Sequence, residues 1–248
     1  METEFHYRFM WDQYTVLERE LEEVLNLLPP HKQNLHAWSP KLGFLLMNVC
    51  SILNSLFKAA QKHSEFQKHD GLKIHWNKKN PDYSNFQPLF ETVYQLSTKP
   101  VYFLPLWYKT IIGDSDIEVI RPIECYPYRN WSPNQPPDWW TWHNKLKHDW
   151  LNFKEKGTLK ETLRGFAGTF MVFVQFLDTR IVLIDADVIR LGGGFMKDVI
   201  KHDYGGLEPL PFGQTLAAKS KLFGYIFETE GCRQRFPSRV FGPDSFHF

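Results

Sequence analysis

The chain has few cysteines, and their positions exclude a framework of disulfide bonds. Cys50, Cys125 and Cys232 are the only three in 248 residues, they lie far apart, and none belongs to a Cys-x-x-Cys pair. A disulfide-stapled secreted domain or a cysteine-rich zinc site needs more cysteines at closer spacing. This cysteine content is typical of a protein in a reducing compartment.

Long hydrophobic runs and an excess of one charge are also missing. The longest apolar run, residues 166–177, contains Gln175 and is shorter than the ~18 residues that a membrane span needs. The first residues, METEFHYRF, lack the basic start of a signal peptide. With a net charge of +1, any nucleic-acid surface would have to be a local patch. We therefore expect a cytoplasmic protein without a membrane segment.

Aromatic side chains are abundant instead. They make up 16% of the chain, including 21 Phe, whereas hydrophobic and charged residues account for 43% and 23%. The last two values are close to those of soluble globular proteins, so core packing explains most of the aromatic residues. The length allows a sizeable core in one domain or in two small ones.

Apolar residues recur at spacings of three and four, which predicts helices over residues 14–28, 40–62, 87–96 and 159–177. Ser39-Pro40 gives a start signal for the second helix, and Thr158 with Glu161 forms a capping box before the last. Residues 63–83 are polar and broken, so we expect a surface loop there. Residues 99–108 and 116–126 combine β-branched and aromatic residues with prolines, which favours edge strands or extended loops.

After Arg180 the sequence takes on the composition of β-strands. Residues 181–184, 187–191 and 221–227 are rich in β-branched and aromatic residues, with glycine-rich turns between them. The sequence therefore predicts a mainly α protein of the α+β type. A helical domain over residues 1–180 carries a small β-rich extension over residues 181–248, packed on it because no long linker divides them.

One stretch, WWTWHNKLKHDW at residues 139–150, carries many polar groups for a core helix. Asp138 stands where it could cap this helix, which we expect to end near Gly157. On a helix Asn144 and His148 share one side, and His143 and Lys147 form a second pair beside them. The apolar side would hold Trp139, Trp142, Leu146, Trp150 and Phe153.

Such a polar face suits a phosphodiester. A neutral imidazole can accept the proton of a ribose 2′-hydroxyl, an amide can orient the phosphate, and a cation can stabilise developing charge, all without a metal or cofactor. The alternative is structural: His148 forms a hydrogen bond across the bundle and the lysines are solvated. For an isolated pattern of this kind the structural alternative is the more frequent one.

The stretch, followed by NFKEKGTLKETLRGFAGTFMVF, resembles the motif segment of HEPN-type helical proteins. In that superfamily an Arg, often followed by a polar residue such as Asn, precedes a His by four to six intervening residues. SPKLGFLLMNVCSILNSLFK resembles the earlier long helix of the family. The resemblance covers residues 139–176 best, and residues beyond 180 take nothing from it.

This resemblance implies an up-and-down helical bundle, usually dimeric, with two copies of the motif in one cleft. Active members are metal-independent ribonucleases, commonly of toxin–antitoxin or anti-phage systems. Carried over to this chain, His148 matches the motif His and would be the base. Asn144 matches the polar residue that orients the phosphate, and His143 stands at the Arg position.

This departure leaves two hypotheses open, because His is charged only in part near neutral pH whereas Arg always is. In addition, CSILN at residues 50–54 lacks the acidic residue of related sequences. Lys147, Lys145 or Arg129 could supply the missing charge. The first hypothesis is a homodimer that binds or cleaves RNA. The second is a non-catalytic HEPN-like interaction protein with a degenerate site, such as an antitoxin-like subunit, a partner or a sensor.

Two further groups complete the candidates. Arg233 and Arg235 beside Phe236 could hold single-stranded RNA by charge and stacking, although a solvated tail is the commoner meaning of such a cluster. Asp185 and Asp187 would share one strand face, which permits a metal-dependent nuclease as a distant third hypothesis. Gly192–Gly194 lacks the pattern of a phosphate-binding loop.

Overall fold

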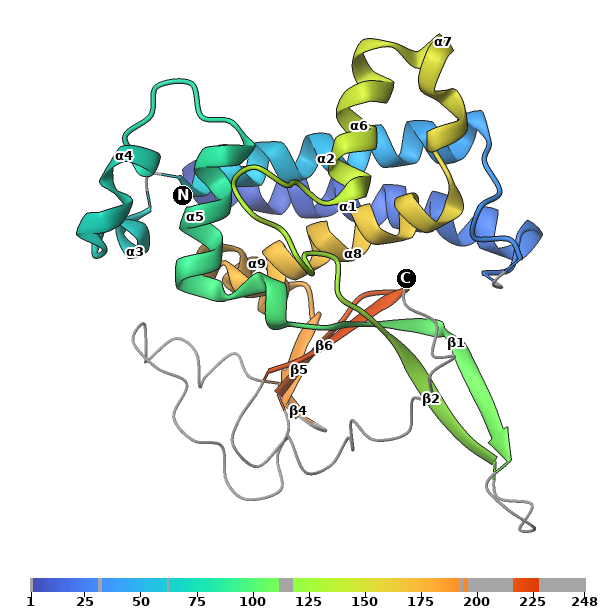
Figure 1. The fold of residues 1–248 in the computed structure, drawn as a ribbon. Helices are drawn as coiled ribbons and strands as arrows, with labels where there is room; N and C mark the ends of the chain where they lie inside the picture. The colour runs from blue at the N-terminus through green and yellow to red at the C-terminus, as the bar shows by residue number, and fades with distance from the viewer. Residues whose placement is uncertain are drawn as a thin grey trace.

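The protein is mainly helical, with one antiparallel sheet on one side of the helices (Figure 1). The structure, a computed structural model, describes residues 2–30, 33–61, 63–111, 118–191, 194–195 and 216–227. The predicted fold class, mainly α with a small β part, is therefore confirmed. The finer assignment to a HEPN-like bundle stays a prediction.

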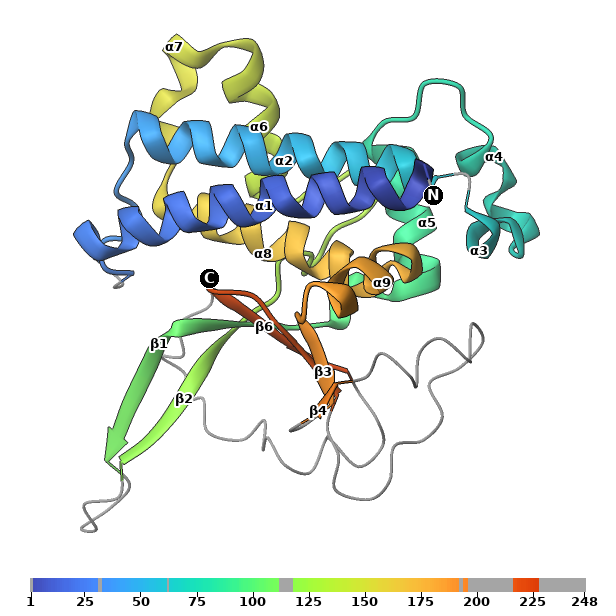
Figure 2. The ribbon, with the colours of Figure 1, turned by 180° about the vertical axis from the view of Figure 1, so that it is seen from behind.

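Three long helices carry the core: α1 (Glu2–Leu27), α2 (Pro40–Ala60) and α8 (Leu159–Gln175). Around them lie α5 (Tyr83–Tyr94), α6 (Asp138–His148) and α9 (Leu177–Asp185). The remaining turns are α3 (Ser64–Gln67), η1 (Asp70–Leu72), α4 (Lys73–Trp76), η2 (Leu96–Thr98), α7 (Trp150–Phe153) and η3 (Lys154–Lys156). Figures 1 and 2 show α1, α2 and α8 side by side, with α6 crossing α2.

Local sequence explains where these helices begin. The Ser39 hydroxyl accepts a hydrogen bond from the backbone N–H of Leu42 at 3.1 Å, and Pro40 is the first residue of α2. Thr158 accepts from the backbone N–H of Glu161 at 3.3 Å at the start of α8. Both residues are therefore confirmed as N-caps, whereas the described hydrogen bonds do not include the reciprocal bond of Glu161 that would complete a capping box.

Aromatic rings fill the space between α1 and α8. The ring of Tyr14 is fully buried and lies 5.7 Å from Phe166, 6.4 Å from Phe170 and 5.7 Å from Phe173, measured between centroids. Such pairs stabilise a fold beyond the burial of their area. The abundance of Phe in the sequence is therefore explained by this core.

Glycine permits the close approach of α6 and α8. A Cβ atom on Gly168 would lie 2.9 Å from the indole of Trp139, which is closer than side-chain atoms normally come. The chain after η3 crosses α2 in the same way, because a Cβ on Gly157 would lie 2.6 Å from the Cα of Gly43. These contacts fix the helix that carries the motif against the core.

The sheet has the strand order β2-β1-β6-β5-β3-β4, and neighbouring strands are antiparallel. Its strands are β1 (Val101–Ile111), β2 (Glu118–Cys125), β3 (Ile189–Leu191), β4 (Gly194–Phe195), β5 (Leu216–Lys219) and β6 (Phe223–Ile226). Strands from both sides of residue 180 meet where β1 pairs with β6, and residue 180 itself lies inside α9. The division of the chain into domains at residue 180 stays a prediction.

A buried carboxylate joins the first helix to the last strands. Glu18 of α1 is 1% exposed and accepts hydrogen bonds from the Ser220 hydroxyl and from the backbone N–H groups of Lys221 and Leu222, at 2.5, 3.2 and 3.0 Å. Burial raises the pKa of Glu18 above its usual range, whereas these donors lower it. This contact fastens α1 to the turn between β5 and β6.

Several local predictions are corrected. Residues 181–184 belong to α9 rather than to a strand, because Val182, Leu183 and Ile184 pack into the core as one helical segment. The predicted loop at 63–83 contains the short helical turns α3, η1 and α4. The helix expected to run to Gly157 stops at His148, and Pro137, not Asp138, stands at its N-cap.

Among the described helices, α2 is long and apolar enough to cross a membrane, and α8 with α9 would pass the same test only as a span bent by 96°. Within α2, 56% of the apolar window is buried inside the protein. Packing in the core accounts for this composition.

Candidate functional site

Helix α6 has a buried side and an exposed side, which decide what each motif residue can do. Trp139, Trp140, His143 and Leu146 are buried, at 1%, 5%, 3% and 1% exposure. Asn144, Lys145, Lys147 and His148 are exposed. The motif therefore presents some of its polar residues to solvent and not others.

His143 is the residue whose predicted position is wrong. It was expected on the polar face, but its ring packs against Trp140 at 5.4 Å between centroids, and neither ring nitrogen has a hydrogen-bond partner among the described residues. Burial, together with the nearby charges of Lys147 and His148, lowers the pKa of His143 to about 4. His143 is therefore neutral at pH 7 and supplies no positive charge to a phosphate.

Asn144 and His148 lie on the exposed side of α6, one turn apart, and His148 is the last residue of the helix. Lys147, also exposed, lies in the same last turn. An imidazole, an amide and an ammonium group thus face solvent together. Cleavage of a phosphodiester by the proposed route requires these three groups. Without His143, Lys147 is the cation among them.

Lysines cover aromatic rings next to these residues. The ammonium group of Lys145 lies 4.7 Å from the Trp142 ring and 5.2 Å from the Phe153 ring, and that of Lys156 lies 4.9 Å from Trp142. We call Trp142, Lys145, Phe153 and Lys156 the lysine–aromatic surface. Its distances are those of cation–π contacts.

The lysine–aromatic surface is locally basic although the whole chain is nearly neutral. Residues 142–160 contain five Lys against Asp149 and Glu155. The carboxylate of Asp149 is engaged by Asn152, whose backbone and side-chain nitrogens donate to it at 3.3 and 2.7 Å. Sequence reasoning placed Trp142 and Phe153 on the apolar side and missed this surface. Lys145, three residues after Trp142, was the available signal.

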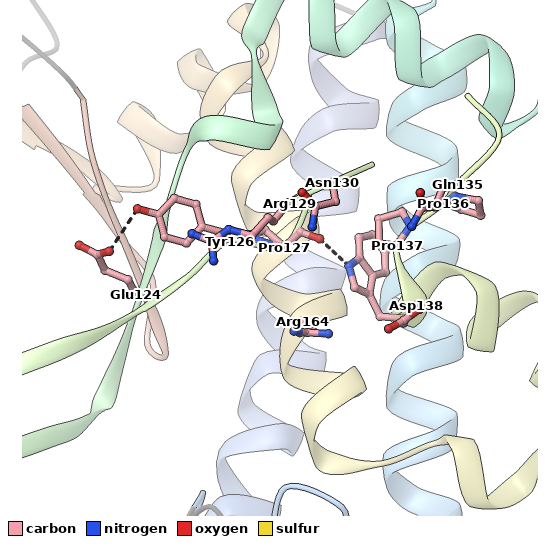
Figure 3. A pocket seen from close by; sticks show the side chains of 11 residues that line it. Glu124, Tyr126, Pro127, Arg129, Asn130, Gln135, Pro136, Pro137, Asp138 and Arg164 are labelled. Atoms are coloured by element: carbon pink, nitrogen blue, oxygen red, sulfur yellow. Dashed lines mark hydrogen bonds between the residues drawn. The ribbon is translucent and has the colours of Figure 1, made fainter. Parts of the chain in front are cut away.

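A second feature lies at the other end of α6, where a cavity of about 220 Å³ opens (Figure 3). Arg129, predicted as a source of charge for the motif, lines this cavity with Asp138. Asp138 is the first residue of α6 and His148 the last, a separation of about 15 Å along the helix axis at 1.5 Å per residue. Arg164 of α8 also lines the cavity and was not singled out in the sequence.

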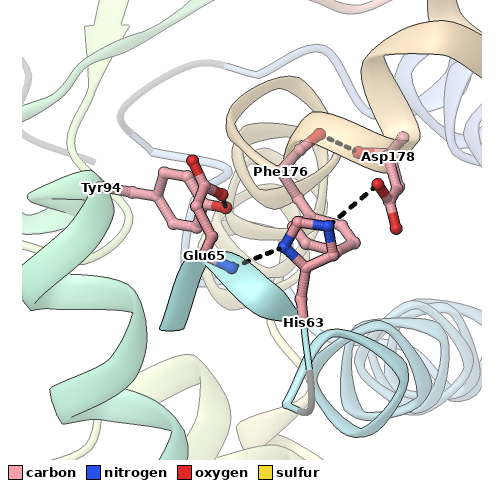
Figure 4. Close-up of polar contacts among 6 residues, drawn as sticks. His63, Glu65, Tyr94, Phe176 and Asp178 are labelled. Atoms are coloured by element: carbon pink, nitrogen blue, oxygen red, sulfur yellow. Dashed lines mark hydrogen bonds and ion pairs between the residues drawn. The ribbon is translucent and has the colours of Figure 1, made fainter. Parts of the chain in front are cut away.

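A cluster between α3, α5 and α9 has a structural role (Figure 4). His63 Nε2 lies 3.1 Å from a carboxylate oxygen of Asp178, and the backbone N–H of Glu65 donates to His63 Nδ1 at 3.2 Å. The Tyr94 hydroxyl donates to Glu65. The hydrogen bond to Asp178 raises the pKa of His63. These bonds connect the segment after α2 to two other helices.

The remaining sequence candidates fall outside a common site. Arg233 and Arg235 lie outside the described residues. Asp185 ends α9, 3.8 Å from the guanidinium of Arg8, and Asp187 follows in a turn with φ 61°, so the two do not share a strand face. In the part of the chain that the structure describes, no group of three His, Cys, Asp or Glu residues could hold a metal ion.

Comparison with known proteins adds no relative: no protein-family model, no curated protein and no solved structure matches this chain.

Proposed function

We propose that the protein binds single-stranded RNA across the exposed side of α6 and the lysine–aromatic surface. One observation carries the proposal: Lys145 and Lys156 both lie over the ring of Trp142. Ammonium groups attract phosphates, and the part-exposed rings of Trp142 and Phe153 give bases a plane on which to stack. This combination favours RNA in single-stranded form, since paired bases cannot reach such rings.

The HEPN resemblance extends the proposal to metal-independent cleavage. In that reaction His148 accepts the proton of a 2′-hydroxyl, the 2′-oxygen attacks the adjacent phosphorus, and the 5′-oxygen leaves with a proton from solvent. Asn144 orients the phosphate, and Lys147 stabilises its developing negative charge in place of His143. The exposed positions of these three side chains support the roles.

A second candidate is a non-catalytic HEPN-like protein that binds RNA or a protein partner. The burial of His143 favours it, because the position of the family's Arg here holds a neutral ring in the core. Arg at this position would bury a permanent cation, which is unfavourable without a paired anion. The motif therefore differs from the family's pattern in its packing as well as in its charge.

Replacing Trp142 by Ala is expected to weaken RNA binding about tenfold, because one stacking base is worth roughly 1–3 kcal/mol. Fluorescence anisotropy with a labelled nine-nucleotide oligo-U measures the affinity. Lys145→Met should also reduce the salt dependence of binding, by about 0.7 in the slope of log affinity against log salt. Lys58→Met, which removes an exposed lysine from α2, is the matched control. Equal losses in Lys58→Met and Lys145→Met would contradict the location of the site.

For the catalytic form of the proposal, purified protein should cleave oligo-U and structured RNA in the presence of EDTA. His148→Ala should abolish this cleavage, and His143→Phe should retain it, because only His148 faces solvent. Gel analysis of end-labelled RNA measures both. RNA binding without any cleavage would favour the non-catalytic candidate, and cleavage that persists in His148→Ala would remove this residue from the mechanism.

The homodimer, the toxin–antitoxin or anti-phage context and the cytoplasmic location stay predictions. Helix α1 offers one feature that supports the dimer: Phe5, Phe9 and Val16 are 69%, 53% and 52% exposed along its outer side. Side chains at these spacings share a face of a helix. A second copy of the chain would cover these apolar residues.

A further inference from the structure

The cavity at the N-terminal end of α6 is lined by both buried and exposed residues. Three of its lining residues are buried, namely Trp139, Pro127 and Pro137. Arg129 and Asp138 are exposed (Figure 3). The remaining lining residues are Glu124, Tyr126, Asn130, Gln135, Pro136 and Arg164. Buried apolar groups beside exposed polar ones suit a planar ligand with a polar periphery.

Hydrogen bonds within the protein hold these walls in place. The indole N–H of Trp139 donates to the carbonyl of Pro127 at 2.8 Å, and the Tyr128 hydroxyl donates to the carbonyl of Gly168 at 3.0 Å. The backbones of Ser132 and Gln135 are joined by two hydrogen bonds at 3.0 and 3.1 Å. The cavity is therefore formed before any ligand enters, which lowers the cost of binding.

Arg164 brings unused donors to this cavity. Its side chain is 20% exposed, and its Nε atom is buried without a hydrogen bond in the described part of the chain. Its Nη1 atom forms an ion pair with Glu161 at 3.9 Å, a distance too long for a hydrogen bond. A guanidinium group is always charged and has five donors, so a sheltered one without hydrogen bonds favours a ligand that accepts them.

The charge of the lining decides which kind of ligand fits. The lining contains two guanidinium groups, of Arg129 and Arg164, and two carboxylates, of Glu124 and Asp138, so its formal charges balance. A free phosphate would meet these carboxylates at close range, and like charges repel. The lining instead matches an uncharged group that carries acceptors on one edge and donors on the next.

The planar groups at the opening and the volume of the cavity favour a nucleobase as its ligand. The Arg129 guanidinium lies 4.5 Å from the centre of the Tyr126 ring, so a charged plane borders the opening. Unstacked bases of RNA bind to aromatic rings and to arginine planes in this way. A volume of about 220 Å³ lies below the roughly 300–1,000 Å³ of drug-sized pockets. The cavity thus has room for one base, with the sugar and phosphate outside.

We propose that this cavity binds one guanine base of the RNA, an inference that rests on the proposed RNA-binding function. The guanine O6 and N7 atoms accept a forked pair of hydrogen bonds from an arginine, here Arg164. Its N1–H and N2–H groups donate to a carboxylate, here Asp138. Adenine presents an amino group in place of O6, which would face the donors of Arg164.

The position of the cavity fits a strand that also covers the lysine–aromatic surface. Asp138, Trp142 and Lys145 follow one another on α6 at spacings of four and three, so they share one face of the helix. Asp138 and Lys145 are about 10 Å apart along the axis at 1.5 Å per residue. One strand can place a base in the cavity and its neighbours over Trp142.

Three labelled nonamers test the inference on the full chain: oligo-U with a single central guanine, adenine or hypoxanthine. The guanine strand should bind about tenfold more tightly than the adenine strand. The hypoxanthine strand, which lacks the N2 amino group, should bind with intermediate affinity. Arg164→Met should remove the preference, and Arg164→Lys should restore only part of it, because an ammonium group cannot form the forked pair. Arg19→Met, an exposed arginine on α1, is the control.

The outcomes separate this inference from the proposed function. Equal binding of the guanine and adenine strands, or a preference that survives in Arg164→Met, would overturn the guanine cavity and leave RNA binding intact. If no strand binds, the proposed function fails. Calorimetry with guanosine, adenosine and inorganic phosphate then tests whether the cavity by itself binds a guanine base. Guanosine binding that is lost in Arg164→Met supports the site. Binding of phosphate in its place, or of none of the three, refutes it.

Discussion

Trp139→Ala is expected to lower the free energy of unfolding by about 3–5 kcal/mol, the usual cost of removing a large buried aromatic side chain. The indole is 1% exposed, donates its N–H to Pro127, and lies 5.6 Å from the Tyr128 ring and 5.9 Å from the Trp140 ring. Gly168 has no side chain with which to fill the space that would be left. The loss is a large part of the roughly 5–15 kcal/mol that stabilises a typical domain.

Urea denaturation followed by circular dichroism measures this loss. The matched control is Trp142→Ala, three residues along the same helix, which should change the free energy of unfolding by less than about 1 kcal/mol because this ring is only half-buried. The two variants should separate stability from RNA binding, the first affecting mainly the fold and the second mainly the affinity. Similar stability of both variants would show that α6 is turned differently against the core.

Lowering the pH from 6.5 to 4 is expected to cost about 3 kcal/mol of stability through His143 alone, since each pKa unit corresponds to about 1.4 kcal/mol. In the folded protein the pKa of His143 is lowered to about 4 from its ordinary 6.5. Between these values the unfolded chain binds a proton that the folded chain does not. The stabilising contribution is therefore present above pH 6.5 and is lost as the pH falls toward 4.

Glu18 and Glu161 act in the opposite direction, because burial raises the pKa of each carboxyl group. Their contribution to the stability of the fold is present below the pKa that these groups have in the unfolded chain. It is lost as the pH rises through their pKa in the folded protein. The effect of His143 must therefore be taken as a difference between variants. His143→Phe keeps a ring against Trp140 and removes the titrating group, so its stability should fall less between pH 6.5 and pH 4.

Urea midpoints of the wild type and His143→Phe across this pH range test the prediction. Asn144→Phe is the control, because this neighbouring residue is exposed and does not titrate, so its replacement should leave the pH dependence of the wild type. If the two Phe variants respond to pH alike, His143 is accessible to water and the assignment of α6 faces fails. His143→Phe should also be at least as stable as the wild type at pH 7, since it removes buried polar atoms that lack partners.

Features that depend on neighbouring residues could be predicted from the sequence. Ser39 and Thr158 cap their helices through bonds to residues three positions on, so the pattern contains the whole interaction. The strands at Val101–Ile111 and Glu118–Cys125 were also recognisable from composition. Residues 181–184 were not, because an apolar run of four suits a buried helix and a buried strand equally.

The orientation of α6 could not be read from the sequence because the stretch holds more indoles than one helix side can bury. The expected apolar side contained Trp142, whereas the structure buries Trp140 and His143. Contacts with Phe57 and Tyr83, 6.0 and 5.9 Å from the Trp140 ring, decide between these alternatives. These partners come from α2 and α5 and are distant in sequence.

The cavity was hidden from sequence analysis for a similar reason. Its charged residues come from the end of β2, the following turn, the start of α6 and the middle of α8. Arg129 and Arg164 line one cavity only once α8 is packed beside the turn that follows β2. The spacing of apolar residues indicates which side of a helix is buried. It does not indicate which loops lie near the end of that helix in the fold.

The hydrogen bonds of Glu18 link residues about 200 positions apart and so govern how the protein reaches its fold. On the ribosome, the N-terminal helix emerges long before the hairpin that it must hold, and until then its carboxylate stays hydrated. Closing so long a loop is slow, and intermediates with unpaired strand edges are prone to aggregate. Folding of this chain should therefore finish only after the turn between β5 and β6 has left the ribosome, and chaperone assistance during synthesis would raise its yield.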